Sequence, residues 1–357
     1  MSARVVICCG SGGVGKTTTS AALALSSAMS GLRVAVLTID PAKRLADSLG
    51  IQNAGGAPQR IPLPDCPGLC DAVILDVQET FEALIHKFSS SPESAHRILS
   101  NRYFQFASTR LGGVHEYMAS EKVRELASSG HYDLVVVDTP PTRNALEFLR
   151  APDRVSGLMD GAVMRWMAMP STRSGWRALE LGSEAVAKVL GMLVGKDTIG
   201  EIAQFFDLFR DLWDGFHQRS IEVKALLASD QTTFLLVSSP APSARREALY
   251  FLSQLKAQGL PFCGFLINRA EAKPEAMDDI EPALADIMGP DLAQTISAIP
   301  KLQAQLAQQH QRSIDALLAA GPDPSAHWII PDLGRPINNL DDLIELSDHL
   351  PRLDSLS

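Results

Sequence analysis

The chain has 357 residues, 46% of them hydrophobic, which is enough for one large domain or two ordinary ones. Acidic residues outnumber basic ones by 41 to 32, and a net charge of −9 gives no long-range attraction for nucleic acid or an anionic membrane. No apolar run reaches the roughly 18 residues that span a bilayer, and no signal peptide precedes the first apolar segment. We therefore expect a cytoplasmic protein that is not integral to a membrane and has no nucleic-acid partner.

A glycine-rich turn between an apolar strand and a helix organises the sequence. The apolar run 5–9 predicts a buried strand, and the Ala/Leu-rich segment 17–30 predicts a helix. Between them, residues 10–17 fit the phosphate-binding pattern G-x-x-x-x-G-K-[ST]. We predict a P-loop in which Lys16 has a catalytic role at the β- and γ-phosphates and Thr17 binds Mg²⁺. The predicted nucleotide-binding residues of this segment are Gly10, Ser11, Gly12, Gly13, Val14, Gly15, Lys16, Thr17 and Thr18.

Apolar strands alternate with helices along the rest of the chain, which is typical of a doubly wound, mostly parallel α/β sheet. The further strands are expected at 32–40, 71–76, 131–138, 233–239, 262–268 and 327–331, and amphipathic helices at 274–320. Two stretches are helical in pattern instead. We expect a P-loop core made of 1–78, 131–150 and 231–357, with a helical subdomain of 79–130 and 151–230 inserted into it.

Two aspartates stand at the ends of predicted strands, where a P-loop fold faces its nucleotide. Asp138 follows four aliphatic residues, as expected of the Walker B acid that holds Mg²⁺ through its water shell. Asp40 is a candidate metal ligand and also the candidate catalytic group that lies near the γ-phosphate and orients the attacking water. The alternatives are an ordinary strand-terminal aspartate at position 138 and a helix cap at position 40.

The strand 262–268 ends in an asparagine whose side chain can pair with a purine edge. A guanine-specific N-K-x-D motif would require an aspartate where this chain has Glu271. We therefore expect Asn268 to bind adenine rather than guanine.

Five segments together resemble ArsA and the eukaryotic ATPase that targets tail-anchored membrane proteins. They are the P-loop, TIDPAKRL at 38–45, G-x-x-E at 113–116, VVVDTPPTR at 135–143 and LINR at 266–269. The resemblance covers nearly the whole chain and is greatest to bacterial ArsA-like ATPases of unassigned substrate. It implies ATP/ADP and Mg²⁺ as cofactors and a nucleotide-gated dimer, with the segments around Asp40 and Asp138 as its two switches. It also implies an adenine site that includes Arg269 and a loop over 331–336 with Pro331 and Leu333.

One position departs from the family pattern. Where the family has a signature lysine that reaches the phosphates of the other subunit, this chain has Ser11, which cannot supply the charge. Three alternatives follow: hydrolysis is weak, a related ArsA-like subunit with an intact lysine supplies it in a heterodimer, or Lys43 or Arg143 substitutes for it. A low-turnover regulatory subunit is thus the alternative to an active homodimer.

The cysteines argue against two family properties. No cysteine occurs in residues 79–262, so the thiolate site of an arsenite-stimulated pump is disfavoured, although a metalloid-extrusion ATPase stays as a third alternative. No C-x-x-C occurs, so a zinc-bridged dimer is not supported.

The predicted helical insertion is rich in methionine and tryptophan, which makes either a flexible surface for hydrophobic or membrane-protein clients or ordinary core. Both interpretations stay open. The residues are Met159, Met164, Met167, Met169, Met192, Trp166 and Trp176.

Overall fold

The computed structural model divides the chain into two compact units. Unit 1 comprises Met1–Ile74, Leu126–Leu146 and Ala228–Ser357, and unit 2 comprises Leu75–Glu125 and Glu147–Leu227. The structure describes residues 3–39, 45, 49–51, 56–101, 114–140, 150–151, 212, 214–272, 287, 289–337 and 339–350. Most of the second segment of the expected helical subdomain, 152–211, lies outside these residues, so that domain division stays a prediction. No helix in the described ranges is long and apolar enough to cross a membrane.

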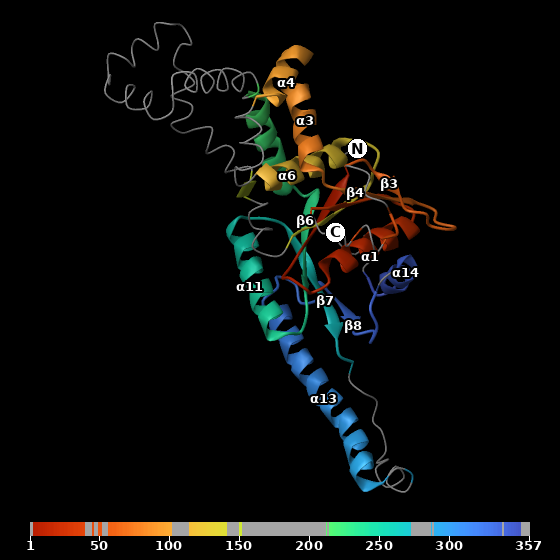
Figure 1. The fold of residues 1–357 in the computed structure, drawn as a ribbon. Coiled ribbons are helices and arrows are strands. Elements are labelled where there is room, and N and C mark those ends of the chain that lie inside the picture. The colour runs from red at the N-terminus through yellow and green to blue at the C-terminus, as the bar shows by residue number, and fades with distance from the viewer. Residues whose placement is uncertain are drawn as a thin grey trace, which may run out of the picture. The chain divides into compact units, whose positions relative to one another are not determined.

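Unit 1 is built on an eight-stranded sheet in the order β3-β4-β2-β5-β1-β6-β7-β8 (Figure 1). All pairings are parallel except that of β3 with β4, so the predicted α/β class and mostly parallel sheet are confirmed. The strands are β1 (Arg4–Cys9), β2 (Arg33–Thr38), β3 (Gln59–Arg60), β4 (Leu69–Ile74), β5 (Leu134–Asp138), β6 (Thr232–Ser238), β7 (Phe262–Ala270) and β8 (His327–Pro331).

The aliphatic runs form strands because both faces of the sheet are covered, so nearly every side chain can be apolar. All five residues of β5 are buried. The short antiparallel β3 lies inside the Pro/Gly-rich stretch expected to be a loop, where the side chain of Arg60 pairs with Asp71 of β4 at 2.5 Å. A two-residue strand leaves no periodic pattern to detect.

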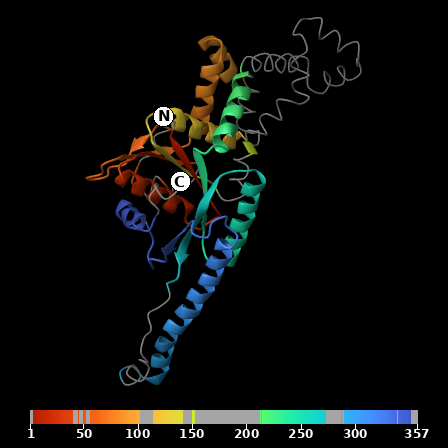
Figure 2. The same ribbon diagram turned by 180° about the vertical axis from the view of Figure 1, so that it is seen from behind.

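Helices cover the sheet on both sides (Figures 1 and 2). On one side α1 (Lys16–Met29) packs against α14 (Leu340–Ser347), and on the other α11 (Pro242–Ala257) packs against β6 and α13 (Pro290–Leu318). Their starts follow ordinary capping chemistry. Both α11 and α13 begin with proline, and the Asn339 side chain caps α14 by accepting the N–H of Asp342 at 2.9 Å.

Unit 2 is helical in its described part. It contains α3 (Val77–Phe88), α4 (Pro92–Leu99), most of α6 (Val114–Ser128) and a helix over residues 214–227. These helices share one apolar core, in which Tyr117 of α6 packs against Phe216 and its hydroxyl donates to the Phe216 carbonyl at 3.3 Å.

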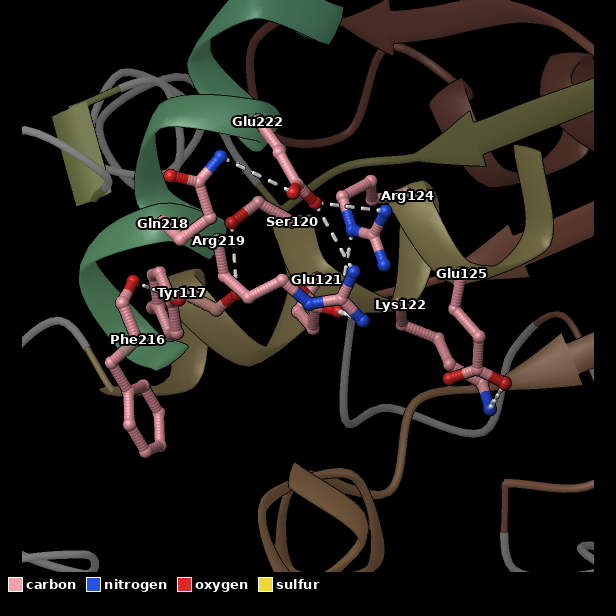
Figure 3. Close-up of polar contacts among 10 residues, drawn as sticks. All are labelled: Tyr117, Ser120, Glu121, Lys122, Arg124, Glu125, Phe216, Gln218, Arg219 and Glu222. Carbon is pink, nitrogen blue, oxygen red and sulfur yellow. Dashed lines mark hydrogen bonds and ion pairs between the residues drawn. The ribbon is translucent and has the colours of Figure 1, made fainter. Parts of the chain in front are cut away.

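A buried ionic cluster joins α6 to the helix over 214–227 (Figure 3). The carboxylate of Glu121, only 2% exposed, lies 2.9 Å from the Arg219 guanidinium and 3.4 Å from that of Arg124. Both arginines also contact Glu222 at 3.2 Å. Burial raises the pKa of Glu121 to about 7, against the opposing effects of Arg124 and Lys87.

The raised pKa predicts that ionisation of Glu121 weakens unit 2 as the pH increases. The pKa of Glu121 in the folded protein exceeds the ordinary 4.5, so the stabilisation that its protonated form gives is complete below about pH 4.5. This stabilisation, on the order of 3 kcal/mol, is lost as the pH rises to about 7. Glu121→Gln should remove this dependence. Denaturant unfolding followed by circular dichroism at pH 5 and pH 8 measures it, with the more exposed Glu125→Gln as the control. Equal pH slopes for wild type and Glu121→Gln would contradict the prediction.

Candidate nucleotide site

The turn between β1 and α1 is held in a shape that requires glycine at two positions. A Cβ on Gly10 would lie 2.1 Å from the Val237 carbonyl oxygen of β6. Gly15 has a φ of +94°, and a Cβ there would lie 2.3 Å from the Asn268 side chain. By contrast, a Cβ on Gly12 would meet no atom within 4 Å. The loop therefore lies directly against the ends of β6 and β7, with its backbone close to its neighbours.

The start of α1 is suited to an anion. Its N-cap, Gly15, makes no side-chain cap, and the first turn contains no acidic residue. The first backbone N–H groups of a helix lack intrahelical partners and carry partial positive charge. The Lys16 ammonium donates to the Ser11 carbonyl at 2.8 Å, which places a buried positive charge over the same loop. Amides and ammonium together form the donor set that a polyphosphate needs.

Three neighbouring strands end beside this loop. In the sheet register, Asp138 of β5 lies opposite Cys8 of β1 and Thr38 of β2. The Asp138 side chain is fully buried, and its Oδ2 accepts a hydrogen bond from the Thr38 hydroxyl at 3.2 Å. The Thr139 hydroxyl donates to the Cys8 carbonyl at 2.7 Å and links the ends of β5 and β1. The carboxylate is thus fixed at the carboxyl edge of the sheet.

The pKa of the buried Cys9 thiol is affected by both charged groups of the site, Lys16 and Asp138. Burial raises the pKa of Cys9 to about 12, Lys16 lowers it and Asp138 raises it. Both groups therefore act electrostatically at the end of β1. The thiol therefore stays protonated at neutral pH.

Asn268 ties the end of β7 to the P-loop. Its side-chain N–H donates to the Val14 carbonyl at 2.9 Å, and its Oδ1 accepts the N–H of Arg269 at 3.0 Å. Arg269 has a φ of +59°, which is unusual for a residue with a side chain. The sequence indicated a base-reading role for Asn268 but gave no sign of this contact. The adenine role stays a prediction.

The predicted adenine loop begins where β8 ends. Pro331 pairs with Ala270 in the sheet, and the N–H of Asp332 donates to the Ala270 carbonyl at 3.0 Å. Leu333 is partly buried and packs against the hydrophobic core. The loop that contains Pro331 and Leu333 therefore begins beside the end of β7, where Asn268 and Arg269 lie.

Several predicted residues lie outside the described part of the chain. These are Asp40, the alternative cations Lys43 and Arg143, and the Met/Trp residues of the predicted client surface. Thr17 and Thr18 are described and half-buried in the first turn of α1. Thr38 and Thr139 were not singled out from the sequence, since their contacts join residues 100 and 131 positions apart and depend on the register between strands.

The donor set fits a magnesium-bound nucleotide. A Cβ on Gly12 or Gly13 would meet no atom within 4 Å, so this side of the loop has room for a ligand. The helix start and Lys16 suit its phosphates, and the Thr17 hydroxyl and Asp138 carboxylate are hard oxygen ligands of the kind that Mg²⁺ prefers. Within the described ranges, no group of three or more His, Cys, Asp or Glu side chains is placed to hold a metal by itself. A metal at this edge would depend on phosphate and water oxygens as well, as is usual for Mg²⁺.

The chain is similar in sequence to several ATPases. The chain is 26% identical over 268 residues to the "Putative arsenical pump-driving ATPase" of Prosthecochloris vibrioformis, a match that covers 74% of this chain and 61% of that protein. It is 25% identical over 338 residues to ATPase ARSA1 of Chlamydomonas reinhardtii, covering 86% of this chain and 41% of that protein. It is 30% identical over 203 residues to ATPase get3 of Schizosaccharomyces japonicus, covering 55% and 59%. The chain spans less than two thirds of the length of each of these relatives.

The family resemblance predicted from the motifs is also confirmed by a family model. The model of the anion-transporting ATPases matches residues 3–283, which is more than half of the chain. This chain therefore belongs to the anion-transporting ATPase family, the ArsA ATPases.

Proposed function

We propose that this chain binds ATP and ADP with Mg²⁺, hydrolyses ATP, and couples nucleotide-dependent closure of a dimer to its helical subdomain. The observation that carries the proposal is the P-loop held against β6 and β7, with the Lys16 ammonium over it and Asp138 fixed beside it by Thr38. It would act in the cytoplasm, without nucleic acid as a partner.

Each residue has a role in this proposal. The loop amides of Gly10–Gly15 and Lys16 bind and neutralise phosphate, Thr17 and Asp138 hold the metal, and Asp40 orients the attacking water. The bound Mg²⁺ supplies counter-charge for the phosphoryl group that is transferred. Asn268, Arg269, Pro331 and Leu333 form the adenine side, and Thr18 belongs to the phosphate-binding turn. Phosphoryl transfer depends on position and charge more than on a strong base, so a buried, fixed carboxylate beside the P-loop suits it.

Ser11 decides between two forms of this proposal. Either a homodimer hydrolyses ATP slowly or with another cation, or the chain is a low-turnover subunit paired with a related ATPase that supplies the signature lysine. Ser11→Lys should raise hydrolysis by the isolated chain roughly tenfold or more, because it restores a positive charge at the phosphates. Steady-state ATP hydrolysis with Mg²⁺ measures this, with Lys16→Ala as the inactive control. Rapid hydrolysis by the wild-type homodimer would rule out the need for a partner ATPase in a heterodimer.

The Met/Trp residues of the helical insertion support a hydrophobic client, such as a membrane-protein segment. Such surfaces repack around varied apolar partners. Replacing Trp166 and Met167 with aspartate should abolish co-purification of a transmembrane segment expressed with the chain. Nucleotide affinity, measured by calorimetry, should stay unchanged. Binding that survives the double substitution would place the client elsewhere, and arsenite-stimulated hydrolysis would favour the metalloid pump instead.

A further inference from the structure

The two halves of α13 have different surroundings. From about residue 307 onwards the helix packs against its own unit. Arg245 of α11 donates to the Ser313 hydroxyl at 3.3 Å, and the Glu271 N–H donates to His310 Nδ1 at 2.9 Å. Towards its N-terminus the helix runs on beyond α11 and the sheet (Figures 1 and 2).

An apolar stripe follows the protruding half. Leu292, Ile299, Leu302 and Leu306 are 51, 49, 62 and 41% exposed. Three of them are seven residues apart and Leu302 follows Ile299 by three, which is the a and d spacing of a coiled coil. The next a position is Ser313, which is buried against the same unit. The a and d face is therefore open from residue 292 to residue 309 and is covered at Ser313.

The charges beside the stripe favour one partner and one direction. Asp291 and Arg312 stand at the two ends of the segment 291–312. The polar positions between them are glutamine, serine or threonine, except for His310 and for Lys301, which occupies a c position away from the seam. Asp291 and Arg312 both occupy g positions, and neither has an ion-pair partner among the described residues. When two copies align antiparallel with Ile299 opposite the partner's Leu302, g faces g. Each Asp291 then faces the partner's Arg312. A parallel pair would leave these charges unmatched.

We propose that a second copy of this chain packs antiparallel along α13, forming a two-stranded coiled coil. Ile299 and Leu302 of both copies form the central layers. Leu306 lies opposite the partner's Thr295, and Leu292 opposite the partner's Gln309. Pro300 falls at a b position, on the outer side of the seam, so it does not interrupt the packing. This interface does not depend on nucleotide and is separate from the proposed closure around ATP.

Sedimentation velocity of the full chain without nucleotide tests the interface. The seam extends over about three heptads, so we expect a dimer with a Kd in roughly the micromolar range. Leu302→Glu should raise that Kd by about 100-fold, because it places a charge in both central layers. The side chain is exposed in the single chain, so folding should be unaffected. Tyr250→Glu, on the exposed face of α11 at 56% exposure, is the matched control and should change nothing.

Direction and register have their own tests. A mixture of Leu292→Cys and Gln309→Cys chains should form an intermolecular disulfide, whereas either chain alone should not, since its two copies of that cysteine lie about 25 Å apart along the axis. Wild type treated with the same oxidant controls for the native cysteines. Asp291→Arg should weaken the dimer, and adding Arg312→Asp to the same chain should restore it.

Four results would overturn the proposal: a monomer up to about 100 µM, a dimer indifferent to Leu302→Glu, self-cross-linking of Leu292→Cys alone, or a stripe that binds an apolar peptide but not a second copy. Nucleotide binding is measured on the same samples. Failure to bind ATP would count against the proposed function and leave the α13 interface standing.

Discussion

Asp138→Asn should lower Mg²⁺-dependent ATP hydrolysis by about 100-fold while leaving the fold intact. Asparagine has the shape of aspartate and still accepts the hydrogen bond from Thr38, which lies 3.2 Å from Asp138 Oδ2. Only the negative charge facing the metal is lost. Steady-state hydrolysis across a Mg²⁺ titration measures the change, and binding of ADP without Mg²⁺ should match wild type.

Two further variants separate the charge of Asp138 from its placement. Thr38→Val removes the hydroxyl that positions the carboxylate, so the Mg²⁺ concentration for half-maximal activity should rise by about tenfold with a smaller change in kcat. Asp133→Asn, just before the other end of β5, breaks an exposed ion pair with Arg33 and should alter neither quantity. Full Mg²⁺-dependent activity in Asp138→Asn would exclude Asp138 from the metal site.

Apart from the two-residue β3, the sheet was predictable because each strand carries its own signal. The apolar runs before Gly10, Asp138 and Asn268 are near-continuous, as burial on both faces requires, and the P-loop pattern shows which end of the sheet faces the nucleotide. The carboxyl edge then follows from the chain direction alone. This is why the polar residues at the strand ends could be grouped into one candidate site from the sequence.

The contacts within the site could not be predicted in the same way. That Thr38 faces Asp138 depends on the register of β2 against β5, and that Asn268 reaches Val14 depends on how β7 ends beside the loop. Neither is a local property of sequence. Likewise, the pattern predicts two or three amphipathic helices over 274–320, whereas α13 runs as one helix from Pro290 to Leu318 and continues through Pro300.

Gly15→Ala should destabilise the fold by about 3 kcal/mol and weaken nucleotide binding by about 100-fold. The new methyl group requires a side-chain residue at a φ of +94° and lies 2.3 Å from the Asn268 amide nitrogen. It therefore pushes Asn268 off the Val14 carbonyl and moves the loop that binds phosphate. Thermal unfolding and calorimetric titration with ADP measure the two effects. Gly12→Ala meets no neighbouring atom, so its stability should equal that of wild type.

A double-mutant cycle attributes the effect to Asn268 itself. If the clash with its side chain dominates, Gly15→Ala with Asn268→Ala should be more stable than Gly15→Ala alone, a non-additivity that independent sites would not show. Asn268→Ala also separates the two roles of this residue. If Asn268 acts by holding the P-loop, Asn268→Ala should lower the affinities for ATP and GTP equally, because the loop binds the phosphates that both nucleotides share. If Asn268 recognises adenine, the same substitution should lower the affinity for ATP and leave that for GTP unchanged. Equal losses for the two nucleotides would show that Asn268 contributes to binding through its hydrogen bond to Val14 and not through the base.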